Sequence, residues 1–125
     1  MPKVSVVMTT FNGEKYIKEQ MDSIRTQSLE PDEVIICDDC STDRTVNFIE
    51  DYIAHFQLKD WKLISNSVNK GWKRNFFDAS KMSTGDVVFF SDQDDIWNRD
   101  KIEKLVTIMT QNEDVGETVR KPKIT

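Results

Sequence analysis

The chain has 125 residues, of which 38% are hydrophobic and 31% charged, and its net charge is -5. This length allows one domain with a substantial core, and the acidic balance argues against a nucleic-acid binder, whose surface would normally be basic. The longest apolar runs are far shorter than the roughly 20 residues that span a bilayer, and residues 1–3 lead into a strand pattern without a signal peptide. We therefore expect a cytoplasmic protein, with any attachment to a membrane surface made by parts outside this sequence.

Strand-like and helix-like patterns alternate along the first half of the chain. β-Branched residues predict a strand at residues 3–8, and an Asn-Gly pair predicts a turn within residues 9–13. Apolar residues at i, i+4 and i+7 predict a helix over about residues 14–27. A second strand is predicted at residues 34–37.

The alternation continues through the second half. Ser41 or Thr42 would cap the next helix. The remaining predicted elements are a helix with the apolar face Val46, Ile49, Ile53 and Phe56, a strand at 61–65, a helix with the core residues Trp72, Phe76 and Ala79 that stops at Gly85, a strand at 86–91, and a helix bearing Ile102, Leu105, Val106 and Met109. This order predicts an α/β fold with a mainly parallel sheet and helices on both faces. We expect one domain over residues 1–111 and a polar, loose tail over residues 112–125.

Two acidic clusters directly follow the apolar runs of the second and fourth predicted strands. Asp38-Asp39 follows the run at 33–37, and Asp92-Gln93-Asp94-Asp95 follows the run at 86–91. Ligands of open α/β sheets bind beyond the carboxyl ends of the strands. Carboxylates gathered there repel one another unless a cation or hydrogen-bond donors neutralise them. We therefore expect a site for a divalent cation and a polar ligand at this edge of the sheet.

Asp92 and Asp94 form an Asp-x-Asp pair. In an extended segment, residues i and i+2 face the same way, so both carboxylates would address one site. Mg²⁺ is commonly held by one or two carboxylates together with substrate phosphates. The position behind a buried strand favours a metal or phosphate role over the alternative, a solvated acidic turn that caps the next helix.

The other strand ends would border the same crevice. Asp38 or Asp39 would accept hydrogen bonds from a ligand, as the acidic residue of dinucleotide folds does, or else would cap the following helix. Thr9, Thr10 and Asn12 would line the crevice with hydroxyl and backbone groups. The sequence lacks both a glycine-rich and a lysine-bearing phosphate loop, so nucleotide binding must use another geometry.

Basic residues open the helix that follows the third strand, although the helix dipole disfavours cations at an N-terminus. Lys70, Lys73 and Arg74 therefore suggest contacts with a diphosphate. The alternative is a solvated helix face.

Cys37 and Cys40 form a Cys-x-x-Cys unit, a spacing found in redox and zinc sites. A zinc site needs about four ligands, yet the only histidine is His55 and there is no second cysteine pair. The carboxylates between the two cysteines also disfavour thiolate chemistry. We interpret Cys37 as a buried strand-end residue, Cys40 as a turn residue and His55 as structural or at the surface.

The complete set of motifs resembles the family 2 nucleotide-sugar glycosyltransferases, which have the Rossmann-like GT-A fold. The resemblance covers about residues 3–106 and is carried, in order, by Val-Ser-Val-Val-Met-Thr-Thr-Phe-Asn at 4–12, Asp-Asp-Cys-Ser-Thr-Asp at 38–43, Asn-Lys-Gly at 69–71, Thr-Gly-Asp at 84–86 and Ser-Asp-Gln-Asp-Asp at 91–95. The stretches Asn-Lys-Gly-Trp and Asp-Gln-Asp-Asp-Ile-Trp are most similar to the branch of rhamnosyltransferases and related polysaccharide-assembly enzymes.

The resemblance implies a role for each matching position. Thr9 and its neighbours would border the base of a nucleoside-diphosphate sugar, and Asp39, supported by Asp38, would accept from the imide N–H of uracil or thymine, so that a UDP- or dTDP-sugar is favoured over a GDP-sugar. Asp92 and Asp94 would hold Mg²⁺ or Mn²⁺ against the diphosphate, with Asp94 as the direct ligand. The implied nucleotide-binding set also contains Lys70, Gly71 and Arg74, although Arg74-Asn75 comes earlier than the Arg-Asn pair of many members.

The implied reaction is an inverting, metal-dependent transfer of the sugar to a saccharide or lipid-linked acceptor, with the metal acting as a Lewis acid. Members of the family are longer, and their second half supplies the general base and the acceptor site. We therefore expect this chain to be the sugar-donor-binding half of a truncated protein, without a general base of its own and inactive by itself. Two alternatives remain: a non-catalytic metal-binding or receiver-like signalling module, which the Thr-Thr-Phe-Asn end of the first strand disfavours, and a thiol redox protein.

Overall fold

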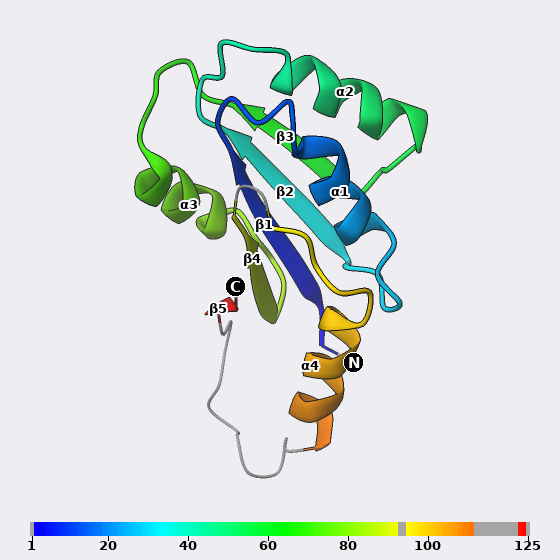
Figure 1. Cartoon of the computed structure of the whole chain (residues 1–125). Coiled ribbons are helices and arrows are strands. Elements are labelled where there is room, and N and C mark those ends of the chain that lie inside the picture. The colour runs from blue at the N-terminus through cyan, green and yellow to red at the C-terminus, as the bar shows by residue number, and fades with distance from the viewer. Residues whose placement is uncertain (1, 93–94, 112–122, 125) are drawn as a thin grey trace.

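The computed structural model describes residues 2–92, 95–111 and 123–124. Strands and helices alternate along these residues, as the sequence predicts (Figure 1). The elements are β1 (Val4–Thr10), α1 (Ile17–Arg25), β2 (Glu33–Asp38), α2 (Thr45–His55), β3 (Trp61–Ser65), α3 (Trp72–Lys81), β4 (Val87–Ser91), α4 (Lys101–Gln111) and β5 (Lys123–Ile124). The predicted α/β class is therefore confirmed.

The strands form a parallel sheet in the order β3-β2-β1-β4-β5. The chain moves outward from β1 through β2 to β3, and then returns to place β4 on the opposite side of β1 (Figure 1). The direction of winding thus reverses between β1 and β4. In open α/β sheets, such a switch point opens a crevice at the carboxyl ends of the strands, where ligands bind.

Alternate side chains of the central strands enter two separate cores. Val6 of β1 and Phe89 of β4 belong to the larger core, which α1, α2 and α4 cover. Their neighbours in sequence, Val7 of β1 and Val88 of β4, point to the other face and belong to a smaller core beneath α3. β1, β2 and β4 are buried on both faces, which explains their continuous apolar runs. The predicted covering of both faces by helices is confirmed.

Some predicted boundaries were wrong at the carboxyl edge of the sheet. β1 continues through Thr9 and Thr10, which had been predicted as turn residues, because they pair with Cys37 and Asp38 of β2. α1 begins three residues later than predicted, at Ile17. α2 begins at Thr45, and the group that satisfies its first turn is Asp43, which accepts from the Thr45 N–H and hydroxyl, rather than Ser41 or Thr42.

The predicted core face of α3 is also corrected. Asn75 and Ala79 are its buried residues, and Phe76 is half-buried with its ring 4.0 Å from that of Phe90. Trp72 is 59% exposed. Asn75 contacts the carbonyl of Cys37, near the end of β2. Trp72 is about one helical turn closer to the start of α3, so it lies beyond the carboxyl ends of the strands and has no strand beneath it.

Gly85 packs between strands and does not stop a helix, since α3 ends four residues earlier, at Lys81. A Cβ atom at Gly85 would lie 2.7 Å from the Ser5 backbone nitrogen and 2.9 Å from the Lys3 carbonyl oxygen. The neighbouring Asp86 accepts from the Lys3 N–H at 2.9 Å. The Thr-Gly-Asp motif therefore joins the amino ends of β1 and β4, at the edge opposite the predicted site.

Two residues of the tail are part of the sheet. Lys123–Ile124 forms β5, which pairs with β4 in parallel, whereas the whole tail had been predicted to be loose. The rest of residues 112–125 lies outside the described residues. Among the described helices, none has the length and apolar character needed to cross a bilayer.

Candidate functional site

The carboxyl ends of β1, β2 and β4 bring the predicted site residues to one edge of the sheet. Thr10 pairs with Asp38 across β1 and β2, and Met8 pairs with Ser91 across β1 and β4. The segments that follow these strands therefore border the switch-point crevice. We call this region, made of residues 9–13, 38–43, 66–74 and 91–95, the carboxyl edge; residues 93 and 94 lie outside the described part of the chain.

Asp39 is a buried carboxylate that organises the loop between β3 and α3. Its Oδ1 accepts from the Lys70 N–H at 2.7 Å and from Asn66 Nδ2 at 3.0 Å, and its Oδ2 accepts from the Gly71 N–H at 2.9 Å. The side chain of Asn69 also donates to the Asp39 carbonyl at 3.1 Å. A carboxylate has about four lone-pair sites, so the hydrogen bonds from the described residues leave one site on Oδ2 for a ligand.

Asp38 is fully buried and holds the ends of β1 and β2 together. Its Oδ1 accepts from the hydroxyls of Thr10 at 2.7 Å and Ser41 at 2.5 Å, and its Oδ2 accepts from the Ser41 N–H at 2.8 Å. Thr9 is buried within β1. Asp38 thus joins the end of β1 to the loop that follows β2. Neither Asp38 nor Asp39 caps α2 through a side-chain hydrogen bond.

Asn12 fastens the loop after β1 to the loop after β2. Its Oδ1 accepts from the Thr42 N–H at 2.8 Å, and its own N–H donates to the Ser41 hydroxyl at 2.8 Å. Asn12 has a φ of 49°, a left-handed conformation that asparagine tolerates better than most residues. The Asn-Gly turn that the sequence indicates therefore shapes the border of the crevice.

Lys70 and Arg74 share one carboxylate. Lys70 Nζ lies 3.0 Å from Asp78 Oδ2, and Arg74 Nε lies 3.3 Å from Asp78 Oδ1. The hydrogen bond from Lys70 is the main cause that lowers the pKa of Asp78, with the charge of Arg74 acting in the same direction. Lys73 instead lies over the ring of Trp72, 5.6 Å from its centroid.

The acidic segment after β4 begins with a closed turn. The Asp95 N–H donates to the Asp92 carbonyl at 3.1 Å, and the Asp92 N–H donates to Asp95 Oδ2 at 3.0 Å. Asp92 is exposed at the carboxyl edge. Asp94, the predicted direct metal ligand, lies outside the described residues.

The described part of this turn suits a hard cation in its chemistry. No group of three or more acidic, histidine or cysteine side chains meets within the described residues. Mg²⁺ needs only one or two carboxylates when substrate phosphates and water supply the other oxygens. An exposed aspartate at the switch point fits that mode of binding.

Three amide side chains at or beside the carboxyl edge had been given no role by sequence reasoning. Asn66 Nδ2 donates to Asn75 Oδ1 at 2.8 Å, in addition to its bond to Asp39, and Asn75 Nδ2 donates to the Cys37 carbonyl at 2.9 Å. Gln20 of α1 donates to Ser91 and to the Asp92 carbonyl. The available signal for Gln20 was its place among Ile17, Met21 and Ile24, the apolar face of its helix.

The cysteines do not form a disulfide. Burial raises the pKa of Cys37 to about 11, and this outweighs the opposing effect of Lys70. Cys40 has a φ of 65° and its thiol lies 3.6 Å from the Ser67 carbonyl, as expected of a turn residue. His55 is exposed at the end of α2, against Phe56.

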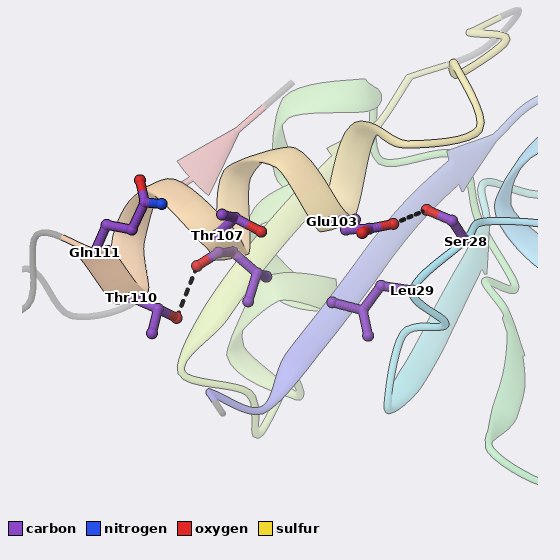
Figure 2. Close-up of a pocket in the computed structure, with 7 residues that line it drawn as sticks. Ser28, Leu29, Glu103, Thr107, Thr110 and Gln111 are labelled. Atoms are coloured by element: carbon purple, nitrogen blue, oxygen red, sulfur yellow. Dashed lines mark hydrogen bonds between the residues drawn. The ribbon is translucent and has the colours of Figure 1, made fainter.

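A pocket of about 370 Å³ lies away from this edge, between α4 and the segment before β2 (Figure 2). Leu29 and Val106 form its apolar part, and Ser28 donates to Glu103 at 2.5 Å along its rim. Because Ser28 and Leu29 precede β2, this pocket lies toward the amino ends of the strands. It contains none of the predicted site residues.

Comparison with known proteins matches residues 5–124 to the model named Glycosyl transferase family 2. The chain is 36% identical over 114 residues to the poly(ribitol-phosphate) beta-N-acetylglucosaminyltransferase TarS of Staphylococcus aureus, with 90% of this chain and 20% of the relative covered. It is 40% identical over 112 residues to the dTDP-rhamnosyl transferase RfbG of Shigella flexneri, with 84% and 37% covered. The chain thus spans well under half the length of these relatives.

Solved structures give the same result. The crystal structure of S. aureus TarS in complex with UDP superposes with a TM-score of 0.79 at 32% identity, over 89% of this chain and 33% of the other. The mannosyltransferase PcManGT from Pyrobaculum calidifontis, in complex with GDP-Man and Mn²⁺, superposes with a TM-score of 0.79 at 27% identity, over 86% and 32%. The predicted GT-A fold is confirmed by these matches.

Proposed function

Because the chain belongs to glycosyl transferase family 2, we propose that it is the sugar-donor-binding part of a glycosyltransferase. Its protein would transfer a sugar from a nucleoside-diphosphate sugar to a saccharide or lipid-linked acceptor. The observation that carries this proposal is the position of Asp39 and Asp92 after β2 and β4, on either side of β1 at the switch point. A nucleotide that lies across the end of β1 would meet one carboxylate at its base and the other at its diphosphate.

The base lies beside Asp39 in this proposal. The three hydrogen bonds that Asn66, Lys70 and Gly71 donate to that carboxylate fix its orientation, and the remaining acceptor site on Oδ2 suits the imide N–H of uracil or thymine. Guanine would also present N–H groups, but a UDP- or dTDP-sugar is the donor that we favour. Thr9, Thr10, Asn12 and Asp38 act by shaping this pocket from beneath and beside it.

The diphosphate lies between the acidic turn and the loop at Lys70–Gly71. Asp92 and Asp94 would hold Mg²⁺ or Mn²⁺, and the Mn²⁺ bound to the similar mannosyltransferase supports this assignment. The metal would supply Lewis-acid stabilisation of the departing nucleoside diphosphate. Lys70 and Arg74 would add positive charge near the phosphates once they turn away from Asp78.

We propose that the reaction inverts the anomeric carbon by in-line attack of an acceptor hydroxyl. The residues assigned above would bind and orient the sugar donor, and we assign removal of the acceptor proton to none of them. We therefore assign the general base and the acceptor site to the part of the relatives that this chain does not span. The whole protein would work in the cytoplasm, at the inner face of the membrane when its acceptor is lipid-linked.

The proposal is tested by calorimetric titration of the chain with UDP-, dTDP- and GDP-sugars, with and without Mn²⁺. We expect Mn²⁺ to raise the affinity for a UDP- or dTDP-sugar, and we expect Asp92→Asn to remove most of that gain. Asp51→Asn, which changes an exposed aspartate on α2, is the matched control and should bind as the wild type does. Absence of any nucleotide binding, or equal binding by Asp92→Asn, would contradict the proposal.

A further inference from the structure

Two buried glutamines, Gln20 within α1 and Gln27 just after it, hold the two ends of the segment that joins β4 to α4. Gln20 is 1% exposed, and its Nε2 donates to Ser91 Oγ at 2.9 Å and to the Asp92 carbonyl at 2.6 Å. Because a carbonyl oxygen can only accept, the contact with Asp92 fixes the orientation of the amide. Gln20 therefore holds the first residue of the acidic turn.

Gln27 holds the other end of the same segment. Its Nε2 donates to the Asn98 carbonyl at 2.6 Å, and its Oε1 accepts from the Ile102 N–H at 3.1 Å, at the start of α4. The Ser28 N–H adds a bond to the Arg99 carbonyl at 2.8 Å. The segment is thus fixed at both ends: its first residue to α1, and its last residues to the chain just after α1.

The two anchors lie seven positions apart, Gln20 within α1 and Gln27 two residues after its end, and each reaches a different end of the segment. The Asp92 carbonyl accepts from Gln20 and also from the Asp95 N–H that closes the acidic turn. Gln20 and the Asp95 N–H thus share one acceptor, the Asp92 carbonyl oxygen. A buried amide costs free energy unless it is hydrogen-bonded, so this position would otherwise favour an apolar side chain like those around it.

We propose that Gln20 is a positioning residue for the metal- and diphosphate-binding turn, with Gln27 as its second anchor. This inference rests on the proposed function, since it assigns Gln20 to the same turn. Gln20 would hold the main chain at Asp92 so that the carboxylate is presented to the cation in one orientation. Partners that orient a metal ligand commonly change metal affinity by about 10–100-fold when they are removed.

The test compares Gln20→Met with the wild type by titration of Mn²⁺, followed by electron paramagnetic resonance, in the presence of UDP. Methionine keeps the length and fills the buried space but cannot donate to Ser91 or Asp92. We expect Mn²⁺ affinity to fall about tenfold, and metal-free UDP affinity to change less than about twofold. Ser91→Ala removes only one of the two partners and should have a smaller effect.

Two further measurements separate positioning from a general loss of stability. Ile24→Ala changes a fully buried residue on the same helix and lowers stability without touching the turn, so its Mn²⁺ affinity should stay within about twofold of the wild type. Amide hydrogen exchange at Asp95 should speed up in Gln20→Met. The Asp95 N–H donates to the Asp92 carbonyl, which Gln20 no longer holds in place. Exchange in β2 should stay unchanged.

Each result decides between the two proposals. Faster exchange at Asp95 together with weaker Mn²⁺ binding supports the role of Gln20. Unchanged exchange, or faster exchange with unchanged Mn²⁺ affinity, overturns that role while leaving the proposed function intact. If the wild-type chain with UDP binds no Mn²⁺, the proposed metal site itself is wrong, and the role of Gln20 at that site fails with it.

Discussion

The Gly71 backbone N–H donates a hydrogen bond to Asp39 Oδ2 at 2.9 Å. Gly71 has φ 85° and ψ 154°, a conformation that is essentially restricted to glycine. This conformation lets the amides of Lys70 and Gly71 point to the two oxygens of one carboxylate. The Asn-Lys-Gly motif and the second acidic cluster are therefore parts of a single structure, although 31 residues separate Asp39 from Lys70.

The first prediction concerns the charge of Asp39. Asp39→Asn keeps the shape of the side chain but replaces one of its two acceptor oxygens with an amide nitrogen, so at least one part-buried N–H loses its acceptor. We expect the free energy of unfolding to fall by about 1–3 kcal/mol, measured by urea denaturation. Affinity for UDP should fall as well, because the pocket loses its acceptor for the base.

Asp51→Asn on the surface of α2 is the control for Asp39→Asn, and should change stability by less than about 0.5 kcal/mol. If Asp39→Asn were as stable as the wild type, the carboxylate would not be organising the loop in the way that its hydrogen bonds indicate.

The sequence predicted the positions of the acidic residues better than their contacts. Asp38, Asp39 and Asp92 were predicted at the carboxyl edge because buried strands have recognisable apolar runs, and the acidic residues follow those runs directly. The partners of Asp39 could not be predicted, since Asn66, Lys70 and Gly71 reach it through a loop whose path depends on tertiary packing. Local patterns contain no information about such contacts.

The helical faces show the same limit. The period of Trp72 and Ala79 correctly indicated one face of α3, but periodicity does not say where the sheet beneath that face ends, so the exposure of Trp72 was not predicted. Gln20 was missed for the opposite reason. It lies on the buried face of α1, where its polarity is an exception to the pattern, and its role is visible only once β4 is placed beside it.

The second prediction concerns Gly85. A side chain at this position would collide with the Ser5 hydroxyl and with backbone atoms of Ser5 and Lys3 at 2.7 and 2.9 Å, and backbone atoms cannot move aside cheaply. We expect Gly85→Ala to lower the free energy of unfolding by about 1–3 kcal/mol in urea denaturation. Removing the Ser5 hydroxyl as well should not restore stability, so a full rescue by Ser5→Ala would contradict the packing argument.

The third prediction concerns alkaline pH. The pKa of Cys37 is raised by burial to about 11 from an ordinary value of 9.0, so the unfolded chain releases this proton first as the pH rises. Its contribution to stability is intact below pH 9.0 and is lost progressively as the pH approaches 11. Cys37→Ala should make the unfolding free energy less dependent on pH in this window, while Tyr52, whose pKa is raised to about 12, maintains part of the dependence.

Thiol labelling checks the same property directly. At about pH 8, the native chain should react with a thiol reagent at Cys40 at least tenfold faster than at Cys37, and urea should abolish the difference. Rapid native labelling of Cys37 would contradict its burial and would revive the redox interpretation.

The last prediction concerns the two cations that face Asp78. Lys70 and Arg74 both contact its carboxylate in the absence of a ligand, and ion pairs at the surface contribute little to stability. If they serve the diphosphate, binding must first take them from Asp78. Asp78→Asn removes that competition, so we expect UDP to bind about two- to fivefold more tightly at low salt, while uridine binds unchanged. Asp100→Asn, which breaks the surface pair with Lys104, is the matched control and should affect neither ligand.

Weaker UDP binding by Asp78→Asn would instead mean that Asp78 holds Lys70 and Arg74 in their binding positions. An equal change in affinity for uridine would exclude a phosphate contact by either cation.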